Sequence, residues 1–220
     1  MTRNFRRTYY KSLGVPVHSF AELLGEDTQT SSLTINLSQL VRMVVEFGLP
    51  AVYRVQVWCI VSQVVPLVRD AEAETWEYVR RERSQIFDDV AMAADVCMPL
   101  SPTTKTSHLM HLHKFYIDYV RPNLHSSLSS DEVKGYTWVS KDVRLIESLA
   151  TAIQEVLEEP ADQFWCLLTF LDHIDRGFKL LQPPVSLEEM YDVSPVALEN
   201  VIFRILAGGS AHPPTGECKN

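Results

Sequence analysis

Helix boundaries recur along the whole chain, and they constrain the fold more than any other feature. Helix-forming runs are bounded by glycine or proline, as between Thr34 and Gly48 and in the run that Pro160 opens. Proline suits the first turn of a helix, and glycine suits the position after its last turn. No internal repeat is visible, and no pair of alternating apolar runs is joined by a hairpin turn. The sequence therefore predicts an all-α, multi-helix bundle.

The predicted helices fill most of the chain. A capping box at Ser19 and Glu22 predicts a first helix that stops at Gly25. Further helices are predicted, each within a few residues, over 35–47, 50–65, 70–97, 108–120, 140–159, 160–176 and 195–206. We expect one helical domain over residues 1–207 and a disordered tail over 208–220, because the end of the chain is polar and rich in glycine and proline.

The stretch GLPAVYRVQVW, from Gly48 to Trp58, alternates like a strand but opens like a helix. With Pro50 at the first helical position, seven apolar residues fall on one side: Tyr53, Val57, Trp58, Ile60, Val61, Val64 and Val65. Arg54 lies inside this apolar arc, so its guanidinium needs a carboxylate or several carbonyl groups. We interpret Arg54 as a structural clamp between helices and Trp58 as a core residue. An anion or partner contact through Arg54 is the alternative.

Composition excludes several classes of function. The 220 residues carry a net charge of −8, which argues against a general nucleic-acid binder. No apolar run approaches the roughly 20 residues of a membrane span. None of the four cysteines forms a CxxC pair, so we expect reduced thiols in a cytoplasmic protein. The three histidines at 108, 111 and 113 lack the spacing of a metal site, and no nucleotide motif is present, so no metal or cofactor is expected.

Three segments follow the pattern of one known family. Gly48-Leu-Pro50, Arg54 and Val57-Trp58 fit the motif G-[IL]-P-x-x-x-R-x-x-[VI]-W, and the run FWCLLTFLDH from Phe164 fits a later Phe-Trp helix. Both resemble the TBC domain, the all-helical module of Rab GTPase-activating proteins. The run RNFRRTYYKSLG is similar to the start of one member, a subunit of the hamartin–tuberin complex. The resemblance covers residues 3–205 and implies structural roles for Phe164 and Trp165.

The same resemblance implies that catalysis is absent. In active members an arginine in I-x-x-D-x-x-R stabilises the transferring phosphoryl group, and a glutamine in Y-x-Q positions water. Here the first motif reads Ile86-x-x-Asp89-x-x-Met92, with methionine in the arginine position. The nearest string to the second motif, GYTW, places Trp138 where glutamine is expected. We therefore expect a chain that is not an enzyme.

Two further departures follow from the comparison with the family pattern. Active members continue with more helices after the Phe-Trp helix, so we expect the C-terminal lobe to be missing and the domain to be truncated. Apolar helix faces would then be uncovered, and the isolated chain should be only marginally stable. The alternative function is a working Rab GTPase-activating protein with rearranged groups, in which Arg80 or Arg144 replaces the missing arginine.

The helix HLMHLHKFYIDYV is the predicted partner surface. Its apolar arc covers more than half of its circumference, wider than the stripe of an ordinary surface helix. A central core helix is the competing interpretation, but the complex-forming family member holds a coiled coil of hamartin against a helical face. We therefore predict that a partner is bound by five residues: Leu109, Leu112, Phe115, Tyr116 and Tyr119.

By resemblance, the leading function is a non-catalytic scaffold that binds a coiled-coil protein of the hamartin type. It would stabilise a hamartin–tuberin-type complex that acts on a Rheb-type small GTPase in TORC1 signalling, so contact with a Rab or Rheb GTPase would be indirect. The expected location is the cytoplasm, with association to lysosomal or vesicle surfaces through the complex. A helical adaptor unrelated to small GTPases is a third possibility.

Overall fold

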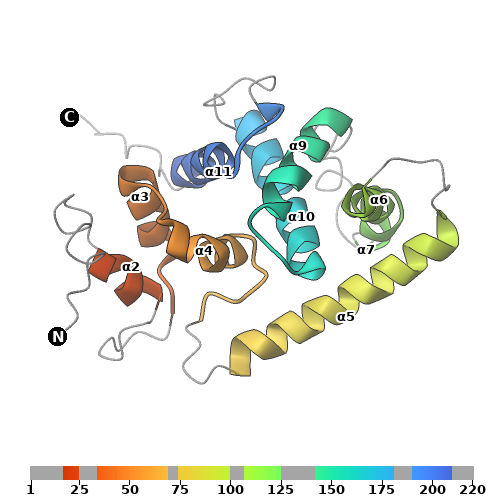
Figure 1. The fold of residues 1–220 in the computed structure, drawn as a ribbon, viewed down its shortest axis with the longest axis horizontal. Helices are drawn as coiled ribbons and strands as arrows, with labels where there is room; N and C mark the ends of the chain where they lie inside the picture. The colour runs from red at the N-terminus through yellow and green to blue at the C-terminus, as the bar shows by residue number, and fades with distance from the viewer. Residues whose placement is uncertain are drawn as a thin grey trace, which may run out of the picture.

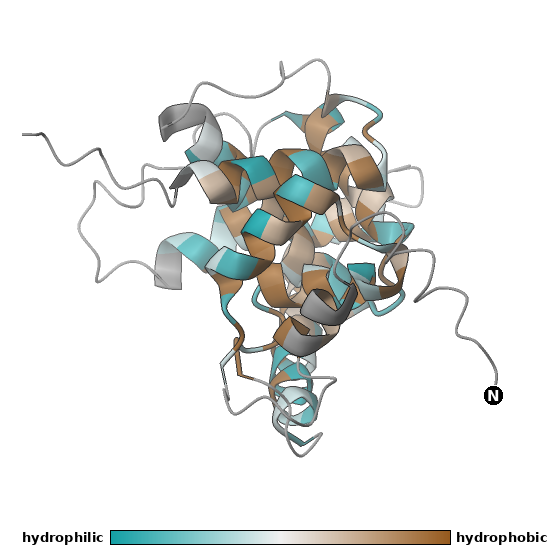
Figure 2. Ribbon diagram, turned by 90° about the vertical axis from the view of Figure 1, so that its left-hand side faces the viewer, coloured by the Kyte–Doolittle hydropathy of each residue, from teal (hydrophilic) through white to brown (hydrophobic). Residues whose placement is uncertain are grey.

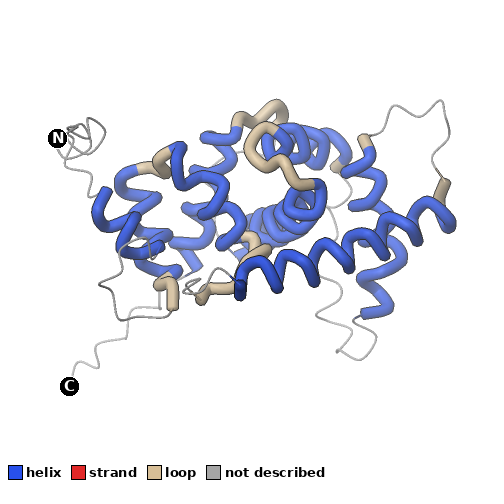
Figure 3. The backbone as a smooth tube through the Cα atoms, turned by 60° about the horizontal axis from the view of Figure 1, so that its bottom comes forward, coloured by secondary structure: helices blue, strands red, loops and turns tan. Residues whose placement is uncertain are grey.

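The computed structural model describes residues 17–24, 34–68, 74–99, 107–124, 142–180 and 190–209. Within these ranges the chain forms helices and turns, with one isolated β-bridge between Thr34 and Val68 (Figure 3). The predicted all-α class is confirmed. Residues 208 and 209, which were predicted to belong to the disordered tail, lie in the last helix, and the rest of the predicted tail, from residue 210, falls outside the described residues.

The helices form a bundle around one long central helix (Figure 1). They are α2 (Val17–Leu24), α3 (Leu37–Phe47), η1 (Ala51–Tyr53), α4 (Arg54–Val61), α5 (Glu74–Cys97), α6 (His108–Phe115), η2 (Tyr116–Val120), α7 (Arg121–Leu124), α9 (Val143–Gln154), α10 (Pro160–Leu180) and α11 (Pro195–Gly209). No described helix is long and apolar enough to cross a membrane.

Helix α3 shows how local signals set the boundaries. Its N-cap is Asn36, whose side chain accepts a hydrogen bond from the Gln39 amide at 3.0 Å. Gly48 follows the helix with φ 77°, a conformation that favours glycine. Gly48 was predicted to follow the last turn of this helix, as it does. Thr34 was predicted to bound its start, but Thr34 lies outside the helix, in the β-bridge. Likewise, α2 begins at Val17, so Ser19 lies within the helix and is not its cap.

The stretch after Gly48 is helical, as predicted, with a 3₁₀ turn η1 leading into α4. All seven residues predicted on the apolar side are buried, and Cys59 and Ser62 are buried as well. The Ser62 hydroxyl donates to the Trp58 carbonyl at 2.6 Å. Helix α4 is therefore enclosed on all sides from Val57 onward, and apolar positions gather where the helices face one another (Figure 2).

Helix α10 organises the core. Pro160 opens it, and it packs against α4, α5, α6, α9 and α11. Gly177 was predicted to end this helix, but the helix continues through it to Leu180. A Cβ atom at Gly177 would lie 2.7 Å from the side chain of Ile205. The glycine therefore permits the close approach of α10 to α11 and is not a stop signal.

Helix α6 continues past its predicted end through an irregular turn. Residues 116–120 form the π-helical segment η2, and α7 follows. The helix was predicted to end at residue 120, yet Pro122 lies within α7. Proline cannot donate the regular backbone hydrogen bond and crowds the preceding turn. A wide π turn just before it interrupts the regular ladder at that point, which lets the chain continue helically.

Candidate functional site

Arg54 forms a tie between two helices that are far apart in sequence. Its Nε donates to Oε1 of Glu199 on α11, and its Nη2 lies 3.5 Å from Oε2 of the same carboxylate. The Trp58 indole also donates to Glu199 Oε1, at 3.0 Å. Glu199 is 4% exposed, so the carboxylate that Arg54 requires comes from the chain itself. This geometry favours the clamp over an anion or partner contact.

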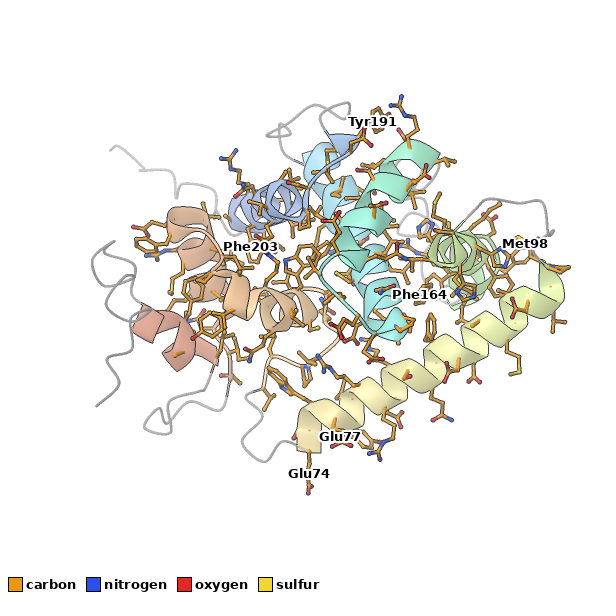
Figure 4. All side chains as sticks on the ribbon, in the orientation of Figure 1. Glu74, Glu77, Met98, Phe164, Tyr191 and Phe203 are labelled. Atoms are coloured by element: carbon orange, nitrogen blue, oxygen red, sulfur yellow. The ribbon has the colours of Figure 1, made fainter. Side chains whose placement is uncertain are left out.

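Phe164 and Trp165 occupy the centre of an aromatic cluster. The Phe164 ring lies 5.6 Å from both Phe87 and Tyr116 and 5.1 Å from Trp165, between centroids. The Trp165 indole donates to the Arg83 carbonyl at 3.1 Å, which joins α10 to α5. Figure 4 places Phe164 on α10 toward α6. Both residues have contacts of the structural kind that the family resemblance implies.

The predicted partner surface on α6 requires a correction. Leu109, Leu112 and Phe115 are 5%, 0% and 4% exposed, so they belong to the core and cannot receive a partner in this conformation. The reason is that α6 is covered by α10, α9 and α5 on different sides. A core helix that is packed against several neighbours also has a wide apolar arc, so the arc does not distinguish it from a helix that binds a partner. Of the five predicted residues, Tyr119 is 51% exposed and Tyr116 is half-buried.

Histidines on α6 are also enclosed. His111 and His113 are 4% and 3% exposed, and His111 Nε2 has no hydrogen-bond partner. Burial lowers the pKa of His113 from 6.5 to about 4, while Asp118 raises it and Arg121 lowers it further. Within the described residues, no three histidine, cysteine or carboxylate side chains gather as a metal site.

The position that the family pattern assigns to the catalytic arginine lies on the outer side of α5. Met92 occupies it and is 64% exposed. Trp138, assigned to the glutamine position, falls outside the described residues. A thioether has neither the charge nor the N–H groups that an arginine would offer a phosphoryl group. Met92 is therefore an apolar group presented to solvent.

Arg80 and Arg144, which the alternative function requires as catalytic groups, are engaged within the chain. Arg80 Nη2 lies 3.6 Å from Asp162 Oδ2 and 3.4 Å from Cys59 Sγ. The guanidinium carbon of Arg144 lies 4.3 Å from the ring centre of Tyr191. These contacts give both arginines roles inside the protein.

Sequence reasoning missed a row of exposed apolar residues on the outer side of α5, which Glu82, Gln85 and Asp89 interrupt. We define the outer stripe as Tyr78, Ile86, Met92 and Val96, which are 61%, 46%, 64% and 77% exposed. At 100° per residue they fall within roughly 120° of one another on the helix. Phe87, Val90 and Ala94 form the opposite, buried face. The signal was available, because the helix has more apolar residues than one packed face can cover.

The ends of α5 differ in character. Glu74 and Glu77 lie in its first turn (Figure 4), where negative charge suits the positive end of the helix dipole. Met92 and Val96 lie in its last two turns, four residues apart. Two of the four residues of the outer stripe, Met92 and Val96, therefore lie near the carboxyl end of the helix.

Comparison with known proteins points to one group of relatives. The chain is 25% identical over 201 residues to TBC1 domain family member 7 of Danio rerio, covering 89% of this chain and 62% of the relative. It is 26% identical over 180 residues to the Xenopus tropicalis protein of that name, covering 80% and 55%. The corresponding human protein is 23% identical over 193 residues, covering 85% and 59%.

These matches have limits. No family model and no solved structure matches the chain. The chain spans about 55–62% of the length of the first two of these relatives. The likeness nevertheless covers both segments that fit the TBC pattern, and every relative found bears the same name. Over most of its length, the chain is thus a protein similar to TBC1 domain family member 7.

Proposed function

We propose that this chain is a non-catalytic scaffold of the TBC type that binds a coiled-coil partner through the outer stripe of α5. The partner would be a protein of the hamartin type, and the assembly a hamartin–tuberin-type complex that acts on a Rheb-type GTPase in TORC1 signalling. Similarity to TBC1 domain family member 7 supports the TBC part of this proposal. The cytoplasm, with recruitment to lysosomal or vesicle surfaces through the complex, is the corresponding location.

The single observation that carries the proposal is the exposed Met92 in the outer stripe. An arginine finger contributes a rate factor of about 10³–10⁵ in small GTPases, and a methionine cannot replace it. In an active family member, an arginine at this position would supply a cation to the bound GTPase. This chain places there an apolar side chain that is 64% exposed. The same position thus loses a catalytic group and gains a group suited to a packed interface.

The shape of α5 suits a helical partner. The helix has 24 residues, a length of about 36 Å, and runs along one edge of the bundle with its outer side uncovered by described residues (Figure 1). Apolar residues three or four apart on one helix are the ones that meet a second helix in a coiled-coil interface. Met92 and Val96 have this spacing, and Ile86 extends the stripe toward the amino end.

Co-purification tests the partner. The full chain and a hamartin-type coiled coil are mixed, and complex formation is measured by size-exclusion chromatography and calorimetry. Replacing Met92 and Val96 together by glutamate should weaken binding at least tenfold, because two charges would be buried against an apolar partner. The matched control replaces Val52 and Val55, which are 66% and 48% exposed elsewhere, and should bind like the wild type. Equal loss in both variants would reject the outer stripe.

A GTPase assay tests the absence of catalysis separately. Substoichiometric chain is added to GTP-loaded Rab and Rheb proteins, and phosphate release is followed. We expect no acceleration by the wild type. Acceleration that survives the Met92→Ala change but disappears with Arg80→Ala or Arg144→Ala would establish the alternative, a GTPase-activating protein with rearranged groups.

A further inference from the structure

A second feature, independent of the outer stripe, is a cavity of about 350 Å³ between α5, the η2–α7 segment and α10. Its walls include Arg83 from α5, Arg121 from α7 and Arg176 from α10. Tyr116 and Trp165 add aromatic surface. Three arginines from three separate helices thus line one cavity.

The charge of this cavity is opposite to that of the chain. Among the described residues of the lining, three arginines and one acidic residue, Asp172, give a net charge of +2, whereas the whole chain has a net charge of −8. His113 and His173 also line the cavity. Because burial lowers the pKa of both histidines, at neutral pH they offer neutral ring nitrogens and the arginines supply the charge.

The cations are held in place by neighbouring groups. The guanidinium carbon of Arg83 lies 4.9 Å from the ring centre of Trp165, and its Nη2 donates to the Gln63 carbonyl at 3.2 Å. Arg176 Nη2 pairs with Asp172 Oδ2 at 2.5 Å. Burial raises the pKa of Tyr116, while the charges of Arg121 and Arg83 lower it.

An ordinary explanation is that each arginine serves only its local contact. That explanation accounts for Arg83, which is stacked and bonded to a carbonyl, and for the surface pair of Arg176. It does not explain why all three arginines line one cavity in which the described residues include a single carboxylate, that of Asp172. Each guanidinium has five N–H donors in a planar fork, so one contact leaves donors available for an anion.

We propose that this cavity binds a phosphate group, either that of inorganic phosphate or that of a phosphorylated small molecule. Guanidinium groups bind phosphate oxygens in bidentate fashion, and a dianion matches the net charge of +2 where a single carboxylate would match one arginine. The Thr169 hydroxyl also lines the cavity, although it donates to the Ser62 carbonyl at 3.0 Å. The volume lies near the lower end of small-ligand sites.

Calorimetry and NMR titration of the full chain test the proposal with three probes: inorganic phosphate, O-phosphoserine and acetate. Saturable binding of phosphate or phosphoserine at one site per chain is expected, with acetate at least tenfold weaker. Tighter binding of phosphoserine than of phosphate would identify a phosphorylated small molecule as the source, and the reverse order would identify free phosphate. No saturation by either phosphate probe, or acetate binding as tightly as they do, would overturn the proposal.

Charge variants locate the site. Arg176→Gln, on a side chain 66% exposed, should weaken phosphate binding about tenfold through loss of a charged hydrogen bond. Asp172→Asn removes the only acidic group among the described residues of the lining and should tighten binding. The matched control is Arg81→Gln on α5, 72% exposed and away from the cavity lining, which should bind like the wild type. Equal effects of Arg176→Gln and Arg81→Gln, or weaker binding after Asp172→Asn, would reject this cavity.

Discussion

The two longest helices of the chain, α10 and α5, serve opposite purposes. Helix α10 has 21 residues and contacts five other helices, and its residues from Phe164 to Leu167 are all buried. Helix α5 has 24 residues but buries fully only Phe87, Val90 and Ala94. Whether a helix belongs to the core therefore depends on how many helices pack around it and not on its length alone.

The difference is consistent with a separation of stability from recognition. A helix enclosed on all sides holds the bundle together, and substitutions there should unfold the chain. A helix packed on one side can change its outer residues at little cost in stability. The predictions that follow would sharpen this contrast or break it, beginning with the largest expected effect.

Phe164→Ala should lower the free energy of unfolding by about 3–5 kcal/mol, because it removes the ring at the centre of the aromatic cluster and leaves a cavity. Urea denaturation followed by circular dichroism measures the change. Val96→Ala on α5 is the control and should change the free energy of unfolding by less than about 0.5 kcal/mol. Similar losses in both variants would erase the contrast between the helices.

Acidification should destabilise the chain through His113, which α10 helps to enclose. The unfolded chain protonates this histidine near pH 6.5, whereas burial lowers its folded pKa to about 4. The unfolded state therefore binds more protons between these values, so stability falls as pH falls from 6.5 to 4, by up to about 3 kcal/mol. His113→Asn should flatten this part of the stability profile. An unchanged profile in the variant would show that His113 is not the responsible group.

Arg54→Ala should cost about 2 kcal/mol of folding stability. Glu199 would stay buried with the Trp58 indole as a donor but without its cation, and the loss is moderated because the Arg54 side chain is 22% exposed. Thermal unfolding at several salt concentrations measures it. Arg81→Ala on α5, whose pair with Glu77 is exposed, should be nearly neutral. A larger loss for Arg81 than for Arg54 would contradict the clamp.

Met92→Ala should leave stability within about 0.5 kcal/mol of the wild type, because the side chain is mostly in solvent. Partner affinity should fall in the same variant if the outer stripe is the docking surface. Denaturation and calorimetry with the coiled-coil probe separate the two quantities. A loss of stability without a loss of affinity would assign Met92 to the fold.

Much of the fold followed from local sequence signals. The helical class, the helical reading of the stretch after Gly48 and its seven buried apolar residues depend on caps, breakers and a 3.6-residue period. The errors concern neighbours distant in sequence. Gly177 looked like a helix stop because the approach of Ile205 from α11 is not encoded nearby, and Leu112 looked available because periodicity does not reveal how many helices surround α6.

The candidate sites divide in the same way. Met92 could be singled out from a motif, and its exposure could have been deduced from its angle on the helix relative to Phe87. The cavity could not be deduced, because Arg83, Arg121 and Arg176 come from helices whose mutual placement depends on the whole bundle. The partner of Arg54 was predictable only as a carboxylate or several carbonyl groups, since Glu199 is 145 residues away.

That separation has a consequence for synthesis in the cell. Helices α3 and α4 form early in the chain, yet α3 packs on α11 and the Arg54 cation meets its carboxylate only there. During synthesis, α3 and α4 therefore leave the ribosome long before α11 has been made. Contacts between segments so distant in sequence also form slowly. Until residue 199 emerges, the nascent protein exposes the apolar surface that α11 later covers. A chain that terminates before α11 should therefore aggregate unless chaperones bind it.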